Sequence, residues 1–162
     1  MADAVHPNVA LVQRMYECFN RNELDTIRSE IFAPDLVWTL PGHHPLSGTK
    51  NGAEEVIAFF AQLVRANIQV TLDPVNDPST GIDTFGDNTV VEVHRGRGTV
   101  TVRAADGSES QANLNALNCT HYQIRDGRIA RVQVYMSDQH AADNFFWAVY
   151  QLKPIPDRLA NA

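Results

Sequence analysis

The sequence predicts an α+β fold in which helices pack on one face of a curved, mostly antiparallel sheet. Helical patterns fill much of the first 67 residues, whereas residues 89–138 contain three long strand patterns joined by hairpin turns. Helices followed by strands are typical of α+β domains, and the alternating βαβ order of a parallel sheet is absent. The 162 residues suit a single domain with a core over about residues 8–150, and we expect an irregular tail over residues 153–162.

Apolar residues at helical spacing predict four helices. In the first, Val9, Val12, Tyr16 and Phe19 repeat every three to four positions. The predicted helices cover residues 8–20, 24–31 and 53–67, with a last helix that follows Ser137. We expect Pro34 to end the second of them.

Short strands are predicted between the helices. Alternation in residues 36–40 and an apolar stretch at 68–72 each indicate a strand. Proline and glycine exclude regular structure from residues 41–48. Residues 82–85 form either a short strand or part of the polar loop that precedes them.

The long strands are joined by the turns Ala105-Asp106-Gly107 and Arg125-Asp126-Gly127. Such a loop fits a two-residue turn or a three-residue turn ending in a left-handed glycine, and the choice moves the register by one residue. The three-residue loop gathers the apolar residues on one face, so we expect it at both turns. These residues are Leu114, Ala116, Tyr122, Ile124, Ala130, Val132, Val134 and Met136. It places His94, Asn118 and Val134 in one row across three strands, unless Gly96 and Gly98 introduce a β-bulge.

The apolar face of these strands also carries Glu92, His94, Asn118, Thr120 and Asp138. Burying such groups is costly unless each finds a partner, which favours a hydrogen-bond network or a site. His94 is the candidate catalytic acid or base because imidazole titrates near neutral pH. Asn118 would orient the ring or hold a substrate oxygen. The alternative is a structural His–Asn hydrogen bond at the edge of the core.

Three further features have two interpretations each. Asp138 is either the N-cap of the last helix or a catalytic carboxylate at the pocket mouth. His43 and His44 are adjacent, so their side chains diverge, and we expect a loop that covers the pocket rather than a metal site. Trp38 and Tyr16 are core residues or ligand contacts.

Composition excludes several classes of protein. The net charge is −6, from 13 basic and 19 acidic residues without a Lys/Arg run, so we expect no nucleic-acid partner. No apolar run is long enough to cross a membrane. Cys18 and Cys119 form neither a disulfide framework nor a metal-ligand spacing, which favours a reducing cytoplasm.

The chain resembles the SnoaL-like polyketide cyclase family of the nuclear transport factor 2-like superfamily over residues 9–146. Short segments in a characteristic order carry this resemblance. They are Tyr16-Glu17-Cys18-Phe19-Asn20, Leu24-Asp25, Phe32-Ala33-Pro34-Asp35, Trp38, Pro41-Gly42, Pro45-Leu46-Ser47-Gly48, Gly52, Phe59-Phe60, Asp126-Gly127-Arg128-Ile129 and Tyr135-Met136.

The resemblance implies a cone-shaped α+β barrel with a deep pocket between three helices and a strongly curved sheet. It implies proton-transfer chemistry on small apolar rings, without metal or cofactor, and a homodimer through the outer sheet face. That face shows Val91, Val93, Leu117, Cys119 and Tyr135. The catalytic positions of the ketosteroid isomerase branch would fall on Met15, Leu40 and Thr120, so that mechanism does not transfer. Those of the epoxide hydrolase branch would fall on Val134, Gly96 and His94.

We therefore predict a cofactor-free cyclase, isomerase or dehydratase that acts on an apolar, ring-containing metabolite. The alternative is a non-catalytic ligand-binding or scaffold protein of the same fold. The predicted catalytic residues are His94, Asn118 and Asp138. The predicted substrate-binding residues are Tyr16, Trp38, His43, His44, Glu92, Thr120, Val134 and Met136.

Overall fold

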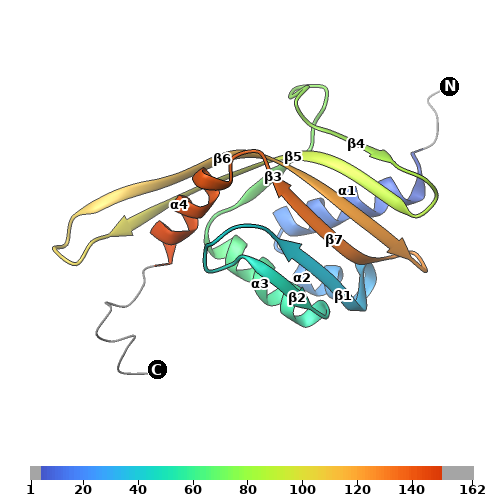
Figure 1. The fold of residues 1–162 in the computed structure, drawn as a ribbon, viewed down its shortest axis with the longest axis horizontal. Helices are drawn as coiled ribbons and strands as arrows, with labels where there is room; N and C mark the ends of the chain where they lie inside the picture. Colours follow the sequence, from blue (N-terminus) through green and yellow to red (C-terminus); the bar gives the residue numbers. More distant parts are fainter. Residues whose placement is uncertain (1–4, 151–162) are drawn as a thin grey trace.

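The computed structural model describes residues 5–150, and its largest element is a seven-stranded sheet (Figure 1). The strands are β1 (Phe32–Leu40), β2 (Gly48–Asn51), β3 (Gln69–Thr71), β4 (Gly81–Thr84), β5 (Thr89–Arg103), β6 (Glu109–Arg125) and β7 (Arg128–Met136). Their order is β2-β1-β7-β6-β5-β3, with β4 also paired to β5. Every pairing is antiparallel except β1 with β7. The predicted α+β fold is confirmed, with an open sheet.

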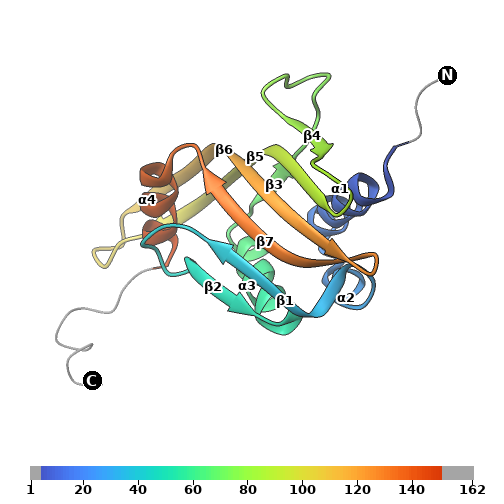
Figure 2. The ribbon, with the colours of Figure 1, turned by 45° about the vertical axis from the view of Figure 1, so that its right-hand side comes forward.

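Helices cover one side of this sheet, as Figures 1 and 2 show for α1 and α3. The helical elements are α1 (Pro7–Asn20), α2 (Leu24–Thr26), the π-helical turn η1 (Ile27–Ile31), α3 (Ala53–Arg65) and α4 (Gln139–Val149). The buried apolar residues of the helices and of the inner sheet face form one core. Among residues 5–150 no helix is long and apolar enough to cross a membrane.

Near β1 one local prediction is wrong and one strand was missed. The second helix does not reach Pro34, because β1 already begins at Phe32 and Pro34 lies inside that strand. A register shift between Phe32 and Val37 accommodates the proline, which cannot donate a ladder hydrogen bond. The strand β2 was not predicted, since its sequence Gly-Thr-Lys-Asn lacks apolar alternation. The tail predicted over residues 153–162 lies outside the described residues.

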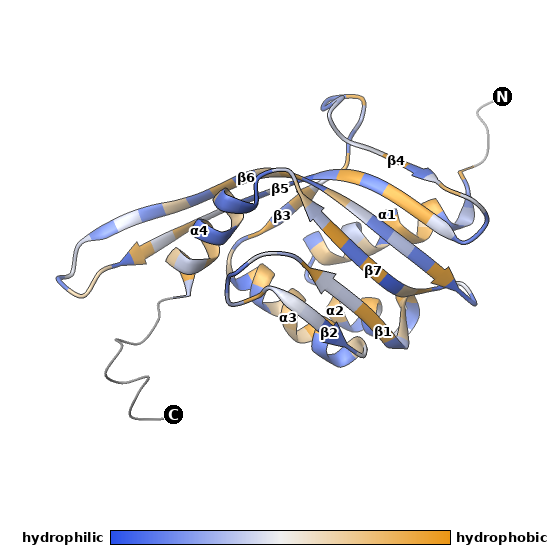
Figure 3. Ribbon diagram, viewed as in Figure 1, coloured by the Kyte–Doolittle hydropathy of each residue, from blue (hydrophilic) through white to orange (hydrophobic). Residues whose placement is uncertain are grey.

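The register of β5 with β6 is confirmed: His94 pairs with Asn118 and Glu92 with Thr120, without a bulge at Gly96 or Gly98. The first turn is the predicted three-residue loop, closed by the Ala104 N–H donating to the Ser108 carbonyl at 2.8 Å. Hydrophobic and hydrophilic bands alternate along these strands in Figure 3, as expected for a sheet with one buried face.

The second turn differs from the prediction. Arg125 pairs with Arg128 across a two-residue loop, in which Asp126 and Gly127 have φ of 51° and 70°. Ala130 is then an extra residue in a bulge, so Asn118 pairs with Met136 rather than Val134. From Arg131 to Met136 the error is two residues, which preserves the face of these side chains because side chains alternate with period two. Next to the turn the error is one residue, so Ile129 faces the core, where it is fully buried, although it was predicted on the outer face.

Candidate functional site

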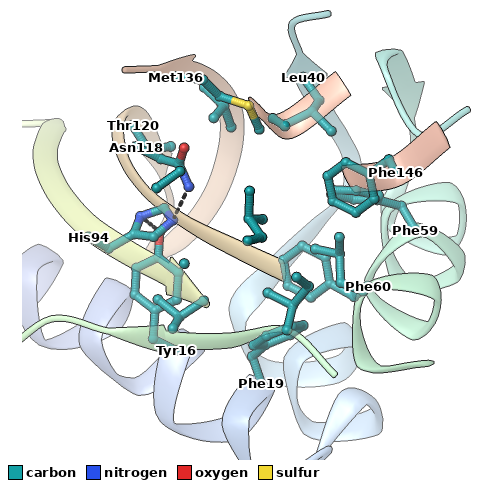
Figure 4. A pocket seen from close by; sticks show the side chains of 18 of the residues that line it. Tyr16, Phe19, Leu40, Phe59, Phe60, His94, Asn118, Thr120, Met136 and Phe146 are labelled. Atoms are coloured by element: carbon teal, nitrogen blue, oxygen red, sulfur yellow. Dashed lines mark hydrogen bonds between the residues drawn. The ribbon is translucent and has the colours of Figure 1, made fainter. Parts of the chain in front are cut away.

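A narrow cavity lies between the inner sheet face and the helices α1, α3 and α4 (Figure 4). The empty space of the cavity, including the part open to solvent, is about 670 Å³. Only about 80 Å³ of this space is accessible to the centre of a water molecule. Aromatic and aliphatic side chains form most of the wall. Of the described residues, those that line it include no Lys, Arg, Asp or Glu. The cavity therefore suits an uncharged ligand.

The polar end of the cavity is built by β5 and β6. Alternation turns Glu92, His94, Asn118 and Thr120 to the inner face, where they are 1%, 8%, 8% and 0% exposed. All four predicted positions are buried on the core face. His94, Asn118 and Thr120 line the cavity, whereas Glu92 lies behind His94.

The Glu92 carboxylate is the centre of a buried hydrogen-bond network. His94 Nδ1 lies 2.9 Å from Glu92 Oε1 and 3.0 Å from Oε2. The Tyr16 hydroxyl donates to Glu92 Oε1 at 2.7 Å and lies 2.5 Å from the Tyr122 hydroxyl. A carboxylate at this depth is tolerated because several donors replace its hydration.

The two tyrosines in this network remain protonated donors. Burial, and then the charge of Glu92, raises the pKa of both the Tyr16 and the Tyr122 hydroxyl well above the ordinary value. Tyr16 was predicted to contact substrate. It does line the cavity, but its hydroxyl faces Glu92 and His94.

The hydrogen bonds around His94 fix the position of its ring proton. Asn118 Nδ2 lies 3.2 Å from His94 Nε2, and an amide N–H can only donate (Figure 4). Nε2 therefore accepts, and the proton of the neutral ring lies on Nδ1, facing Glu92. The arrangement presents the basic nitrogen of His94 at the cavity side and holds the other nitrogen against a carboxylate.

Three buried polar atoms of cavity-lining residues have no partner within hydrogen-bonding geometry among residues 5–150. They are Trp38 Nε1, Asn118 Oδ1 and Thr120 Oγ1. An unpaired buried donor or acceptor costs about 1–3 kcal/mol, so a bound molecule that pairs with them gains affinity. Val134 and Met136, which were predicted to bind substrate, also line the cavity.

Asp138 is exposed and is not among the residues that line the cavity. Its Oδ1 accepts a hydrogen bond from the Ala141 N–H at 2.9 Å, which makes it the N-cap of α4. Of the two interpretations of this residue, the structure shows the cap.

Replacing Asp138 with Ala should therefore reduce stability, with little effect on ligand binding. We expect a loss of about 1 kcal/mol in the free energy of unfolding, typical of a lost N-cap, measured by urea denaturation. Asp138→Asn, which can still accept the same hydrogen bond, is the control and should retain most of the stability. A large loss of ligand affinity with unchanged stability would contradict the capping role.

His43 and His44 do not line the cavity. The His43 side chain is 96% exposed, whereas His44 is buried and stacks on Phe146, a cavity-lining residue, with ring centroids 4.6 Å apart. Trp147 Nε1 donates to the His43 carbonyl at 2.7 Å, so the loop is anchored on α4. Burial lowers the pKa of His44, against the opposing effect of Asp143. Among residues 5–150 no three His, Cys, Asp or Glu side chains are grouped to hold a metal ion.

The sequence prediction missed much of the apolar wall. The unpredicted lining residues are Phe19, Leu40, Phe59, Phe60, Leu63, Ile68, Val70, Gly96, Leu114, Ala116, Ala142 and Phe146. Their helical or strand periodicity marked most of them as core, but periodicity does not distinguish the wall of a cavity from a filled core. Tyr122, predicted on the core face, contributes its hydroxyl to the network around Glu92.

Comparisons with known proteins give a consistent result. A family described as the SnoaL-like domain matches residues 12–132. An uncharacterized protein of Mycobacterium tuberculosis is 29% identical over 141 residues, which cover 85% of this chain and 94% of that protein. The structure of Bal32a, from a soil-derived mobile gene cassette, has a TM-score of 0.71 at 22% identity and covers 86% of this chain and 96% of its own. IdmH, a proposed polyketide cyclase from Streptomyces antibioticus, has a TM-score of 0.64 at 22% identity, with coverage of 86% and 98%.

Proposed function

The chain belongs to the SnoaL-like family of the nuclear transport factor 2-like superfamily, and from this membership we propose that it is a cofactor-free acid/base catalyst. Its substrate would be a small, uncharged, ring-containing molecule that undergoes cyclisation, isomerisation or dehydration. The observation that carries the proposal is the Glu92–His94 pair, whose basic nitrogen lies at a largely apolar cavity.

The proposed chemistry begins with a C–H bond next to a substrate carbonyl. His94 Nε2 takes this proton, and the electron pair moves to the carbonyl oxygen as an enolate. Glu92 stabilises the imidazolium through Nδ1–H, as a carboxylate partner does in other acid/base sites. The Asn118 amide, released from Nε2, donates to the enolate oxygen. The imidazolium then donates its proton either to a different atom of the substrate or to a hydroxyl group of the substrate, which leaves as water.

Deuterium exchange into a ring ketone tests this proposal without knowledge of the natural substrate. In D₂O the protein should accelerate exchange of the acidic C–H of 2-tetralone, an uncharged bicyclic ketone, above the buffer rate, as measured by mass spectrometry. 2-Naphthol, which has a similar shape but no such C–H, should compete and suppress the acceleration. Exchange at the buffer rate by a protein that binds 2-tetralone would exclude the acid/base function for this class of ring ketone.

A second candidate function is a pocket that binds its ligand without reaction. The hydrogen bond from Asn118 to His94 Nε2 favours it, because this bond occupies the lone pair that a base would use. Binding of 2-naphthol and 2-tetralone with no accelerated exchange is the result expected of such a protein.

We also propose a homodimer through the outer face of the sheet. Val93, Cys119 and Tyr135 form a row across β5, β6 and β7 on this face, and Tyr135 is 57% exposed. Light scattering should give about twice the mass of one chain for the wild type, and Tyr135→Glu should give a monomer because a charge would be buried. Tyr135→Phe is the matched control and should remain dimeric. A monomeric wild type would contradict the dimer.

We infer a cytoplasmic location from the cysteines. Cys18 and Cys119 are both free thiols, the first buried and the second half-buried. Free thiols persist in reducing compartments.

A further inference from the structure

Gly96 is a glycine that the fold does not require. It lies in the middle of β5, it is buried, and its φ is outside the left-handed region that favours glycine. A Cβ added there would meet only Asn118 Nδ2 at 3.4 Å and the Ala116 carbonyl at 4.0 Å. Glycine inside a strand weakens it, so its presence here needs another explanation.

Gly98 lies two residues further along the same strand and on the same face, but unlike Gly96 it has no room for a Cβ. A Cβ at Gly98 would lie 2.6 Å from Ile68 Cδ1 and 3.2 Å from both the Ala66 carbonyl and Phe145 Cζ. Close packing of the α3–β3 connection and α4 therefore accounts for Gly98. The missing side chain of Gly96 instead leaves space in the cavity that Gly96 lines.

The surroundings of Gly96 point to a ligand in that space. Gly96 pairs with Val70 on one side and with Ala116 on the other, and all three line the cavity. The next row along the sheet holds His94 and Asn118. Asn118 is 8% exposed, its Nδ2 is the atom nearest to the open position, and its Oδ1 has no hydrogen-bond partner in the described chain. The amide that borders this unfilled patch of backbone through Nδ2 thus carries an unsatisfied acceptor on its other terminal atom, Oδ1.

We propose that a flat ring of the ligand lies directly on the backbone of β5 at Gly96, with a ring hydroxyl or enol donating to Asn118 Oδ1. Gly96 is then a specificity-determining residue, because it sets how thick and how wide a ring the cavity accepts next to His94. This inference rests on the proposed function, which requires that the cavity bind a ring.

The experiment compares two phenols, 2-naphthol and phenol, on the full chain by titration calorimetry or fluorescence. Gly96→Ala should weaken 2-naphthol binding by about tenfold or more, since one methyl group then occupies the face of the ring. Phenol, which fills less of the cavity and can shift, should change by at most about twofold. Ala116→Val, directly across the sheet, should produce the same selective loss.

Thermal unfolding separates the ligand effect from a folding effect. Gly96→Ala should keep or raise the Tm, because alanine suits a strand better than glycine. Gly98→Ala is the matched control and should lower the Tm by about 4 °C or more, since its Cβ meets packed atoms.

The outcomes distinguish this inference from the proposed function. Selective loss of 2-naphthol at an unchanged Tm supports the ring position. Equal binding of 2-naphthol by the wild type and Gly96→Ala overturns it while leaving the proposed function standing, as does a Gly96→Ala Tm that falls as far as that of Gly98→Ala. A wild type that binds neither phenol overturns the ring position, and it overturns the proposed function as well when the exchange of 2-tetralone also stays at the buffer rate.

Discussion

His94→Gln is expected to lose the accelerated deuterium exchange of 2-tetralone by about 10²–10⁴-fold, the usual contribution of a positioned acid or base. Glutamine reaches a similar distance and can hydrogen-bond with Glu92 and Asn118, but its amide does not accept a proton near neutral pH. The variant therefore removes proton transfer while it preserves much of the local network. The measurement is the initial exchange rate by mass spectrometry at saturating 2-tetralone.

Binding of 2-naphthol provides the control for this variant. The apolar wall of Phe19, Phe59 and Phe60 is unchanged, so His94→Gln should bind 2-naphthol within a few fold of the wild type. Asn118→Leu should behave differently and weaken binding as well as exchange, because it removes the amide beside the cavity. Wild-type exchange rates in His94→Gln would remove His94 from the mechanism.

The pairing of β5 with β6 was predictable because several residues constrained it together. A one-residue error would have turned Leu114, Ala116 and Tyr122 to the outside, so the apolar pattern allowed one choice. The pairing of β7 was less constrained. A two-residue turn without a bulge aligns Tyr122 with Arg131, whereas the bulge at Ala130 pairs Tyr122 with Val132, which alternation alone does not reveal.

The network around Glu92 shows where sequence patterns stop being informative. Strand alternation placed Glu92, His94 and Tyr122 on one face, but the Tyr16 hydroxyl comes from α1, 76 residues away from Glu92 in sequence. The contact between Tyr16 and Glu92 depends on how α1 packs against the sheet, and the periodicity of the sequence does not specify that packing. The same limit explains why the apolar wall from α3 was assigned to the core.

Glu92→Leu should destabilise the protein by about 3 kcal/mol or more, since a buried donor left without its acceptor costs about 1–3 kcal/mol and several donors surround this carboxylate. Leucine has a similar volume, so the loss does not come from a cavity. It comes from the hydroxyls of Tyr16 and Tyr122 and from His94 Nδ1–H, which would be left without the acceptor they surround. Urea denaturation followed by tryptophan fluorescence measures the change.

Two companion variants determine whether this loss belongs to the network. Tyr122→Phe removes one donor and leaves the carboxylate otherwise satisfied, so it should cost only about 1 kcal/mol. The Glu92→Leu/His94→Leu double variant removes both partners of the pair and should be less destabilised than the sum of its single variants, because the second substitution removes a group already unpaired. If Glu92→Leu cost no more than Tyr122→Phe, the carboxylate would not be the centre of the network, and His94 would lack the partner that fixes its ring proton.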